Sequence, residues 1–296
     1  MRFISKRLQH YFEYFLLKFL EYIFNLFPIL WSYKFIKFLG LAIYYFFPIR
    51  KMTAYYNLKR VFPNKDDKTI YSIIKNMYVN FSYFILESII MQKLRRTLHK
   101  NVDVLGLENL QQAVSQNKGV VLYTAHLGNW HIMGQKLVDM GFVVNNIVKK
   151  QRNSLVFDEE VAAMKKVGMK TTILQKTPKN IFKAFKDKDI VEFLADQDAG
   201  DDGIFIDFFG TKASTATGPA LFSLKLGAPM IFAIDVRQGL FKHKIFLETI
   251  KFDSKGDLNA DIMDLTHLLT KKLEQYIMDY PDQYFWLHKR WLTREK

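Results

Sequence analysis

The sequence predicts an α/β protein in which helices flank a central sheet, with an apolar helical membrane attachment at the N-terminus. From residue 102 onward, short runs of Val, Ile, Leu and Phe alternate with helical stretches, which is typical of an α/β sheet. By contrast, residues 11–49 are apolar almost throughout and rich in Phe and Tyr. We therefore expect two parts, a membrane-associated helical segment at 1–51 and an α/β domain at 52–296.

The composition narrows both the chemistry and the partners of the chain. It has no cysteine and a formal net charge of +14 over 296 residues. The absence of cysteine excludes disulfides, thiolate nucleophiles and thiolate metal sites. The positive charge indicates an anionic partner, and the basic residues are scattered through apolar sequence instead of forming a dense run. We therefore expect a membrane surface and anionic lipid as partners, and no nucleic acid.

The N-terminal apolar segment is predicted to form two helices that lie in the membrane interface, flanked by basic residues that contact anionic headgroups. Its longest charge-free runs cover 22–33 and 38–49, whereas a spanning helix needs roughly 20 apolar residues. Pro28 and Pro48 are placed to end the two helices. A tilted span and a helical hairpin packed on the domain are the alternatives. The polar residues of the first helix share one arc of a helical wheel: Glu13, Lys18, Glu21 and Asn25.

The α/β domain is predicted to begin with a helical scaffold, in which Asn64 or Asp66 caps the second helix. Residues 102–128 then indicate a short strand, a helix and a buried strand. Functional loops in such sheets gather at the carboxyl ends of the strands, so we expect the site there. Further strands are predicted at 143–150, 171–175, 190–198, 229–239 and 244–252. Helices are predicted around 158–167, 178–187, 215–226 and 262–279.

The stretch GVVLYTAHLGNWHIMG carries His126 out of a buried strand and into a helix that ends near Met140. Gly128 and Asn129 permit the tight turn between the two. An imidazole at this position can deprotonate a hydroxyl, and free backbone N–H groups at 127–130 can stabilise an oxyanion. A purely structural histidine is the alternative.

No metal site is expected from the histidines or from the acidic stretch DQDAGDDG. On a continuous helix, His126 and His131 would point about 140° apart, unlike the ligand pair of a zinc protease helix. The acidic stretch at 196–203 lacks the terminal Glu of a calcium loop, which favours a structural or active-site loop.

Six motifs occur in order between residue 57 and the C-terminus. They are NLKRVFP at 57–63, GLENL at 106–110, AHLGNW at 125–130, FLADQDAGDDGIFIDFFG at 193–210, ATGPALFSLKLGAPMI at 216–231 and PDQYFWLHKRW at 281–291. Together they resemble the late acyltransferases of lipid A biosynthesis (lauroyl and myristoyl acyltransferases), within the lysophospholipid acyltransferase superfamily.

The resemblance implies a glycerolipid-acyltransferase-like fold with a central mixed sheet flanked by helices. It also implies that His126, the histidine of an HxxxxE or HxxxxD motif, activates an acceptor hydroxyl that attacks a thioester. The acyl donor would be an acyl carrier protein or coenzyme A thioester, and no cofactor would be required. The acceptor would be a lipid A precursor in lipopolysaccharide synthesis or another membrane lipid, at the cytoplasmic face of the inner membrane.

The chain departs from this motif at one position, because His131 stands where the family has a carboxylate. A protonated His131 would oppose both the helix dipole and the imidazolium at His126, so we predict that His131 is neutral. Asp196 and Asp198 are the candidate substitutes, since both leave a strand end. Otherwise the histidine pair serves an altered acceptor, as in an N-acyltransferase making an amino-acid lipid, or the chain is a catalytically impaired lipid-binding relative.

Further residues are predicted to bind substrate. Residues 149–153, KKQRN, match the place of an RPxxN-like element in related enzymes, with Lys149 at the arginine position, Arg152 as a possible replacement donor and Asn153 retained. A solvated basic loop is the alternative. Arg237 matches a family arginine at a strand end and is suited to phosphate. The predicted substrate-binding set is Gly128, Asn129, Lys149, Arg152, Asn153 and Arg237.

Overall fold

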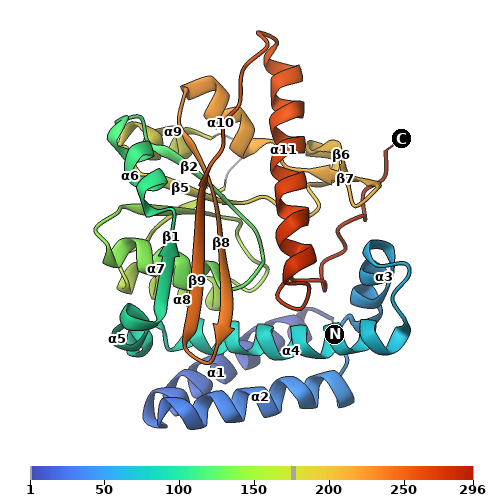
Figure 1. Cartoon of the computed structure of the whole chain (residues 1–296). Helices are drawn as coiled ribbons and strands as arrows, with labels where there is room; N and C mark the ends of the chain where they lie inside the picture. Colours follow the sequence, from blue (N-terminus) through green and yellow to red (C-terminus); the bar gives the residue numbers. More distant parts are fainter. Residues whose placement is uncertain (1, 175–177, 296) are drawn as a thin grey trace.

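A seven-stranded sheet with helices on both faces forms the centre of the molecule. Figure 1 shows the computed structural model, which describes residues 2–174 and 178–295. The strand order is β1-β9-β8-β2-β5-β3-β4, and every neighbouring pair is parallel except the hairpin β8–β9. The predicted α/β fold with a central mixed sheet is therefore confirmed.

The strands of this sheet are β1 (Val102–Leu105), β2 (Val120–Thr124), β3 (Val144–Val148), β4 (Lys170–Ile173), β5 (Ile190–Leu194), β8 (Met230–Gly239) and β9 (Lys242–Thr249). All five strands predicted after β2 are present, although Gln175, at the end of one predicted range, lies outside the described residues. A separate antiparallel hairpin, β6 (Ile204–Phe208) and β7 (Thr211–Thr215), follows the acidic stretch and is not among the predicted strands.

Two layers of helices cover the sheet. The helices after α1 and α2 are α3 (Lys51–Val61), α4 (Asp67–Ile89), α5 (Met91–Asn101), α6 (Leu107–Ser115), α7 (Trp130–Asp139), α8 (Ser154–Lys166), α9 (Lys179–Lys186), α10 (Gly218–Leu226) and α11 (Leu258–Asp279), with a short 3₁₀ turn at Gly200–Asp202. Asp66, one of the two predicted caps, accepts a hydrogen bond from the Thr69 backbone N–H at the start of α4.

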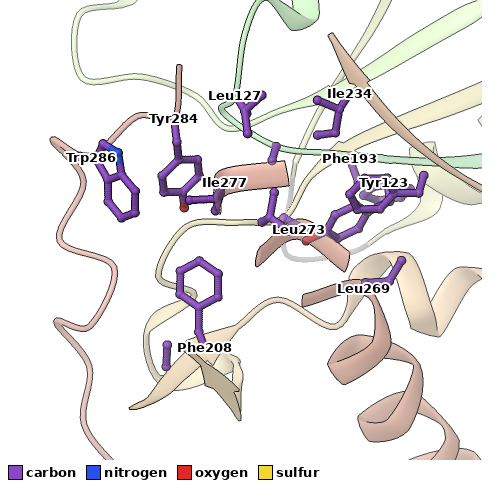
Figure 2. Packing of buried hydrophobic residues seen from close by; sticks show 14 of the residues in the cluster. Tyr123, Leu127, Phe193, Phe208, Ile234, Leu269, Leu273, Ile277, Tyr284 and Trp286 are labelled. Atoms are coloured by element: carbon purple, nitrogen blue, oxygen red, sulfur yellow. The ribbon is translucent and has the colours of Figure 1, made fainter. Parts of the chain in front are cut away.

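Strand β2 is buried on both faces, as expected for an inner parallel strand. Successive side chains point to opposite faces, so Val121 and Tyr123 join the cluster beneath α11. Leu122 joins the second cluster, beside Ile132 and Leu137 of α7. Figure 2 shows the first cluster, in which Tyr123 packs with residues of β5 and α11 and side chains of the C-terminal segment complete the core. The two cores fix β2, and with it the start of α7.

The N-terminal segment forms α1 (Arg2–Leu26) and α2 (Ile29–Phe46), which lie beside α4 at one end of the molecule (Figure 1). α1 ends two residues before Pro28, and α2 ends two residues before Pro48, so the two prolines follow the helix ends as predicted. Across residues 2–174 and 178–295, no helix has both the length and the apolar character needed to cross a membrane.

The polar arc of α1 faces the protein. Glu13 accepts a hydrogen bond from the Asn153 side chain at 2.8 Å, and Lys18 forms an ion pair with Glu159 of α8 at 3.1 Å. Phe12 and Phe15 are 68% and 64% exposed, whereas Phe24 near the end of the helix is buried in the second cluster. The helix therefore attaches to the domain through its polar arc and Phe24, while several other large apolar side chains of α1 are exposed.

Candidate functional site

The predicted base, His126, lies two residues beyond the end of β2, at the mouth of α7. The turn between them requires Gly128, whose φ of +66° lies in the left-handed region and where a Cβ would come within 1.8 Å of the Asp235 carbonyl oxygen. Asn129 then caps α7 by accepting hydrogen bonds from the His131 and Ile132 backbone N–H groups. The turn thus holds His126 at the carboxyl end of the sheet.

A buried carboxylate from the neighbouring strand orients His126. Asp196 follows β5, which pairs with β2 in parallel, and its Oδ1 lies 2.7 Å from His126 Nδ1. Burial opposes ionisation of Asp196, but the charge and hydrogen bonds of His126 outweigh it, so the pKa of Asp196 is lowered. With Asp196 ionised, Nδ1 carries the imidazole proton and Nε2 keeps its lone pair.

The imidazole borders a cleft with aromatic walls. These walls come from α4, the start of α7 and the C-terminal segment, and the Trp130 ring centroid lies 4.8 Å from that of His126. The aromatic lining residues are Phe81, Phe84, Trp130, Tyr284 and Phe285. The lining also includes Asn80, Arg237 and Gln283, so the cleft combines aromatic walls with polar groups.

His131 does not take the place of the missing carboxylate beside His126. Its ring is buried, and its Nδ1 lies 2.8 Å from the Ser88 hydroxyl oxygen of α4. Burial, followed by the nearby charge of His126, lowers the pKa of His131 to about 4. His131 is therefore neutral at pH 7, as the sequence analysis predicted.

The second candidate carboxylate, Asp198, binds Thr293 of the C-terminal segment. It accepts hydrogen bonds from the backbone N–H and the hydroxyl of Thr293, at 3.2 and 2.9 Å. The structure therefore brings Asp196 to His126 and ties Asp198 to the C-terminal segment.

Arg237, predicted to bind phosphate, lies in a buried ion pair. Its guanidinium donates to Glu87 of α4 at 2.6 Å, and the Glu87 carboxylate is fully buried. Burial opposes ionisation of Glu87, but Arg237 outweighs it and lowers the pKa of the carboxyl well below its usual range. Glu87 also accepts hydrogen bonds from Asn129 Nδ2 at 2.7 Å and from the Tyr33 hydroxyl of α2. Asn129 and Arg237 thus have buried protein partners, and Arg237 also lines the cleft beside His126, so their predicted roles in substrate binding stay predictions.

A second buried pair supports the same turn. Asp235 Oδ2 accepts from the Asn129 backbone N–H at 2.9 Å and lies 2.7 Å from His243 Nδ1. Burial disfavours the charged imidazole, but Asp235 outweighs it and raises the pKa of His243 to about 9. The sequence analysis missed Glu87, Asp235 and His243, because each sits in an ordinary helix or strand pattern and meets its partner only in the folded chain.

Two of the four predicted oxyanion donors at 127–130 are used by the protein. The Gly128 N–H donates to the Gln283 carbonyl at 3.1 Å, and the Asn129 N–H donates to Asp235. Within the described residues, the Leu127 and Trp130 N–H groups have no protein acceptor. Two backbone donors therefore stay available beside His126, and their action on an oxyanion stays a prediction.

The loop at 149–153 has exposed basic side chains and one buried asparagine. Lys149 and Arg152 are exposed, as expected for the alternative of a solvated basic loop. Asn153 is buried, caps α8 through the Leu155 N–H, and donates to the His10 carbonyl at 3.0 Å and to Glu13. Asn153 therefore anchors α1 to the domain and does not face the His126 cleft.

A strand-end histidine, paired with a buried carboxylate and open to an aromatic cleft, defines an α/β protein equipped for general-base chemistry on an apolar substrate. Comparison with known proteins identifies it further. The sequence profile described as "Bacterial lipid A biosynthesis acyltransferase" matches residues 3–293, so the chain belongs to that family and is an acyltransferase. The suspected resemblance is confirmed.

Individual relatives are distant. The chain is 23% identical to a lipid A biosynthesis acyltransferase of Haemophilus influenzae, over 83% of this chain and 77% of the relative. It is 27% identical to the lipid A biosynthesis palmitoleoyltransferase of Escherichia coli, over 67% of this chain and 63% of that enzyme. It is 23% identical to a phosphatidylinositol mannoside acyltransferase of Mycobacterium tuberculosis, over 71% of this chain and 66% of the relative.

Proposed function

We propose that the protein transfers a fatty acyl chain from a thioester of acyl carrier protein or coenzyme A to a hydroxyl of a lipid A precursor or a related membrane lipid. The observation that carries this proposal is the His126–Asp196 pair at the aromatic cleft, in a chain of the lipid A acyltransferase family. The pair provides a base whose Nε2 is free to accept a proton. The aromatic walls suit an acyl chain or the apolar part of a lipid.

In the proposed reaction, His126 Nε2 takes the proton of the acceptor hydroxyl while its oxygen attacks the thioester carbonyl carbon. The C–S bond then breaks, and the imidazolium returns the proton to the departing thiolate. Asp196 receives the Nδ1–H throughout and stabilises the imidazolium. The Trp130 N–H is the backbone donor suited to the carbonyl oxygen as it becomes negative. Every proton is returned and no atom changes its oxidation state, so the step needs no redox cofactor.

We further propose that α1 and α2 hold the enzyme at the cytoplasmic surface of the inner membrane. Both helices expose large apolar side chains, whereas Glu13 and Lys18 of the polar arc of α1 contact α8 and the residue that caps it. Basic residues accompany this surface, which suits anionic lipid headgroups. The exposed apolar residues include Phe12, Phe15, Phe19, Tyr22, Trp31, Phe38 and Phe46, and the basic ones include Lys6, Arg7, Lys34 and Lys37.

Mass spectrometry of total lipids from a deletion strain tests the proposed function. Loss of the gene is expected to leave one lipid species short of a single acyl chain, and wild-type protein restores it. His126→Ala is expected to fail to restore it, whereas His267→Ala, at an exposed position of α11, restores it fully. An unchanged lipidome would support the impaired lipid-binding alternative, and a missing amide-linked chain would support N-acylation.

A further inference from the structure

The His131 ring lies between two helices that each present a polar group to it. Ser88 of α4 contacts Nδ1, as described above, and Glu160 of α8 places its Oε1 at 3.9 Å from Nε2. Phe84 and Trp130 pack on the ring from α4 and α7. His131 thus bridges the catalytic helix α7 to a carboxylate on α8.

Nothing else among the described residues satisfies the inner nitrogen of His131. Nε2 is buried and has no hydrogen-bond partner in the described part of the chain, so Glu160 is placed to receive its proton after a small side-chain movement. The other oxygen of Glu160 is held by Gln151 Nε2 at 2.8 Å. The neighbouring Glu159 turns the other way and pairs with Lys18 of α1. Two consecutive carboxylates of α8 therefore serve different partners.

The charge of the proposed base, His126, acts on both Glu160 and His131. Burial raises the pKa of Glu160, and the positive charge of His126 opposes this rise. The same charge at His126 contributes to the lowered pKa of His131. His126, His131 and Glu160 therefore interact electrostatically, and Asp196 binds the Nδ1 of the same His126 ring.

We infer that Glu160 is a positioning residue that supplies, through His131, the negative charge missing at the motif position. This inference rests on the proposed function. The family carries a carboxylate at the fifth position after the histidine, whereas this chain has a neutral imidazole there and a carboxylate from α8 behind it. In this chain the carboxylate therefore lies on α8, whereas the motif places it on the helix that follows His126.

The proton count is consistent with this arrangement. The Ser88 oxygen lies 2.8 Å from both the Phe84 carbonyl and His131 Nδ1. The hydroxyl has one proton, so Ser88 can donate to Nδ1 only by giving up its bond to the Phe84 carbonyl; the neutral His131 then carries its proton on Nε2 and points it at Glu160. The cluster of His131 and ionised Glu160 then has a net charge of −1, which is the charge of the carboxylate that the family motif provides.

Kinetics of Glu160→Gln in the full-length enzyme tests the inference. We expect kcat/KM for acyl transfer to fall about tenfold or more, because the imidazolium at His126 loses a stabilising charge. The acid limb of the kcat/KM profile should move to lower pH, because the same charge favours the protonated base. Asp158→Asn, an exposed carboxylate of the same helix, is the matched control and should change neither quantity.

A rescue experiment separates this role from a merely structural one. His131→Glu combined with Glu160→Gln returns a carboxylate to the motif position, so kcat/KM and the acid limb should recover most of their wild-type values. Glu160→Gln that behaves as wild type overturns the inference. So does an impaired Glu160→Gln whose acid limb is unmoved and whose activity the second change does not restore. If His126→Ala keeps wild-type activity, the proposed function itself fails, which is a distinguishable result.

Discussion

His126 Nδ1 and Asp196 Oδ1 lie 2.7 Å apart because their strands run side by side in register. Thr124 of β2 pairs with Leu194 of β5, and each site residue follows its strand by two positions. Two residues in extended chain return to the same face, so the two side chains meet at the sheet edge.

This relationship predicts the effect of Asp196→Asn. An amide cannot stabilise the imidazolium and favours the wrong tautomer, so kcat should fall by about 10²- to 10⁴-fold while binding of the acyl donor changes little. Steady-state kinetics with an acyl thioester measures both. Asp198→Asn is the control, since Asp198 binds Thr293, and it should keep kcat within a few-fold of wild type. The reverse ranking of the two variants would contradict the assignment.

The Glu87–Arg237 pair predicts a stability effect. Arg237→Met leaves the fully buried Glu87 carboxylate without its main partner, which should lower the free energy of unfolding by about 3–5 kcal/mol. Urea denaturation measures the change. Replacing both residues by Met should cost less than Arg237→Met alone, because no buried charge is then left unpaired. If Arg237→Met is as stable as wild type and weakens only the binding of phosphorylated lipid, the phosphate role predicted from sequence is correct.

Glu192 of β5 predicts a specific pH dependence of stability. Its side chain is 1% exposed, and burial raises its pKa to about 8. The folded state holds this proton to higher pH than the unfolded state does. Its contribution to stability is therefore complete at low pH and is lost as pH rises from about 4.5 through 8, by up to about 5 kcal/mol.

Glu192→Gln should remove that loss. The variant should lose less stability than wild type between pH 5 and pH 9 in urea denaturation, whereas Glu108→Gln, an exposed carboxylate of α6, should follow wild type. Parallel curves for Glu192→Gln and wild type would show that Glu192 ionises at its ordinary pH in the folded protein.

The outward face of α1 predicts binding to lipid. Phe15→Ser combined with Phe19→Ser removes two side chains that are 64% and 60% exposed. If each contributes about 1.5 kcal/mol on burial in lipid, the double variant should bind anionic phosphatidylglycerol vesicles roughly 100-fold more weakly. Co-sedimentation with vesicles measures this. Met263→Ser, at an exposed apolar position of α11, should bind as wild type does, and equal binding by all three proteins would contradict the role of α1.

Local patterns in the sequence predicted most of the fold. Strand β2 has a continuous apolar run and β5 is apolar except for Glu192, while Gly128 with Asn129 marks the turn that ends at α7. These signals lie within a few residues, so periodicity and turn chemistry find them. The β6–β7 hairpin was missed because its strands are short and the acidic stretch before it suggested a loop.

The site was only partly predictable, since its contacts join distant segments. Asp196 could be proposed because strand ends converge, yet Asp198 satisfied the same rule and the sequence could not separate them. Glu87 meets Arg237 across 150 positions of the chain, and no local pattern marks either partner. The polar arc of α1 was found correctly, but periodicity cannot say whether an arc faces water or protein. Here it faces α8.

Acyl transfer by the purified protein tests the central claim most directly. Full-length enzyme is incubated in anionic vesicles that contain a lipid A precursor, with a radiolabelled acyl thioester as donor. We predict that label moves to an ester of the lipid with wild-type protein and that His126→Ala lowers the rate by at least about 10³-fold. Equal transfer by the His126→Ala variant would contradict the assignment of His126 as the base.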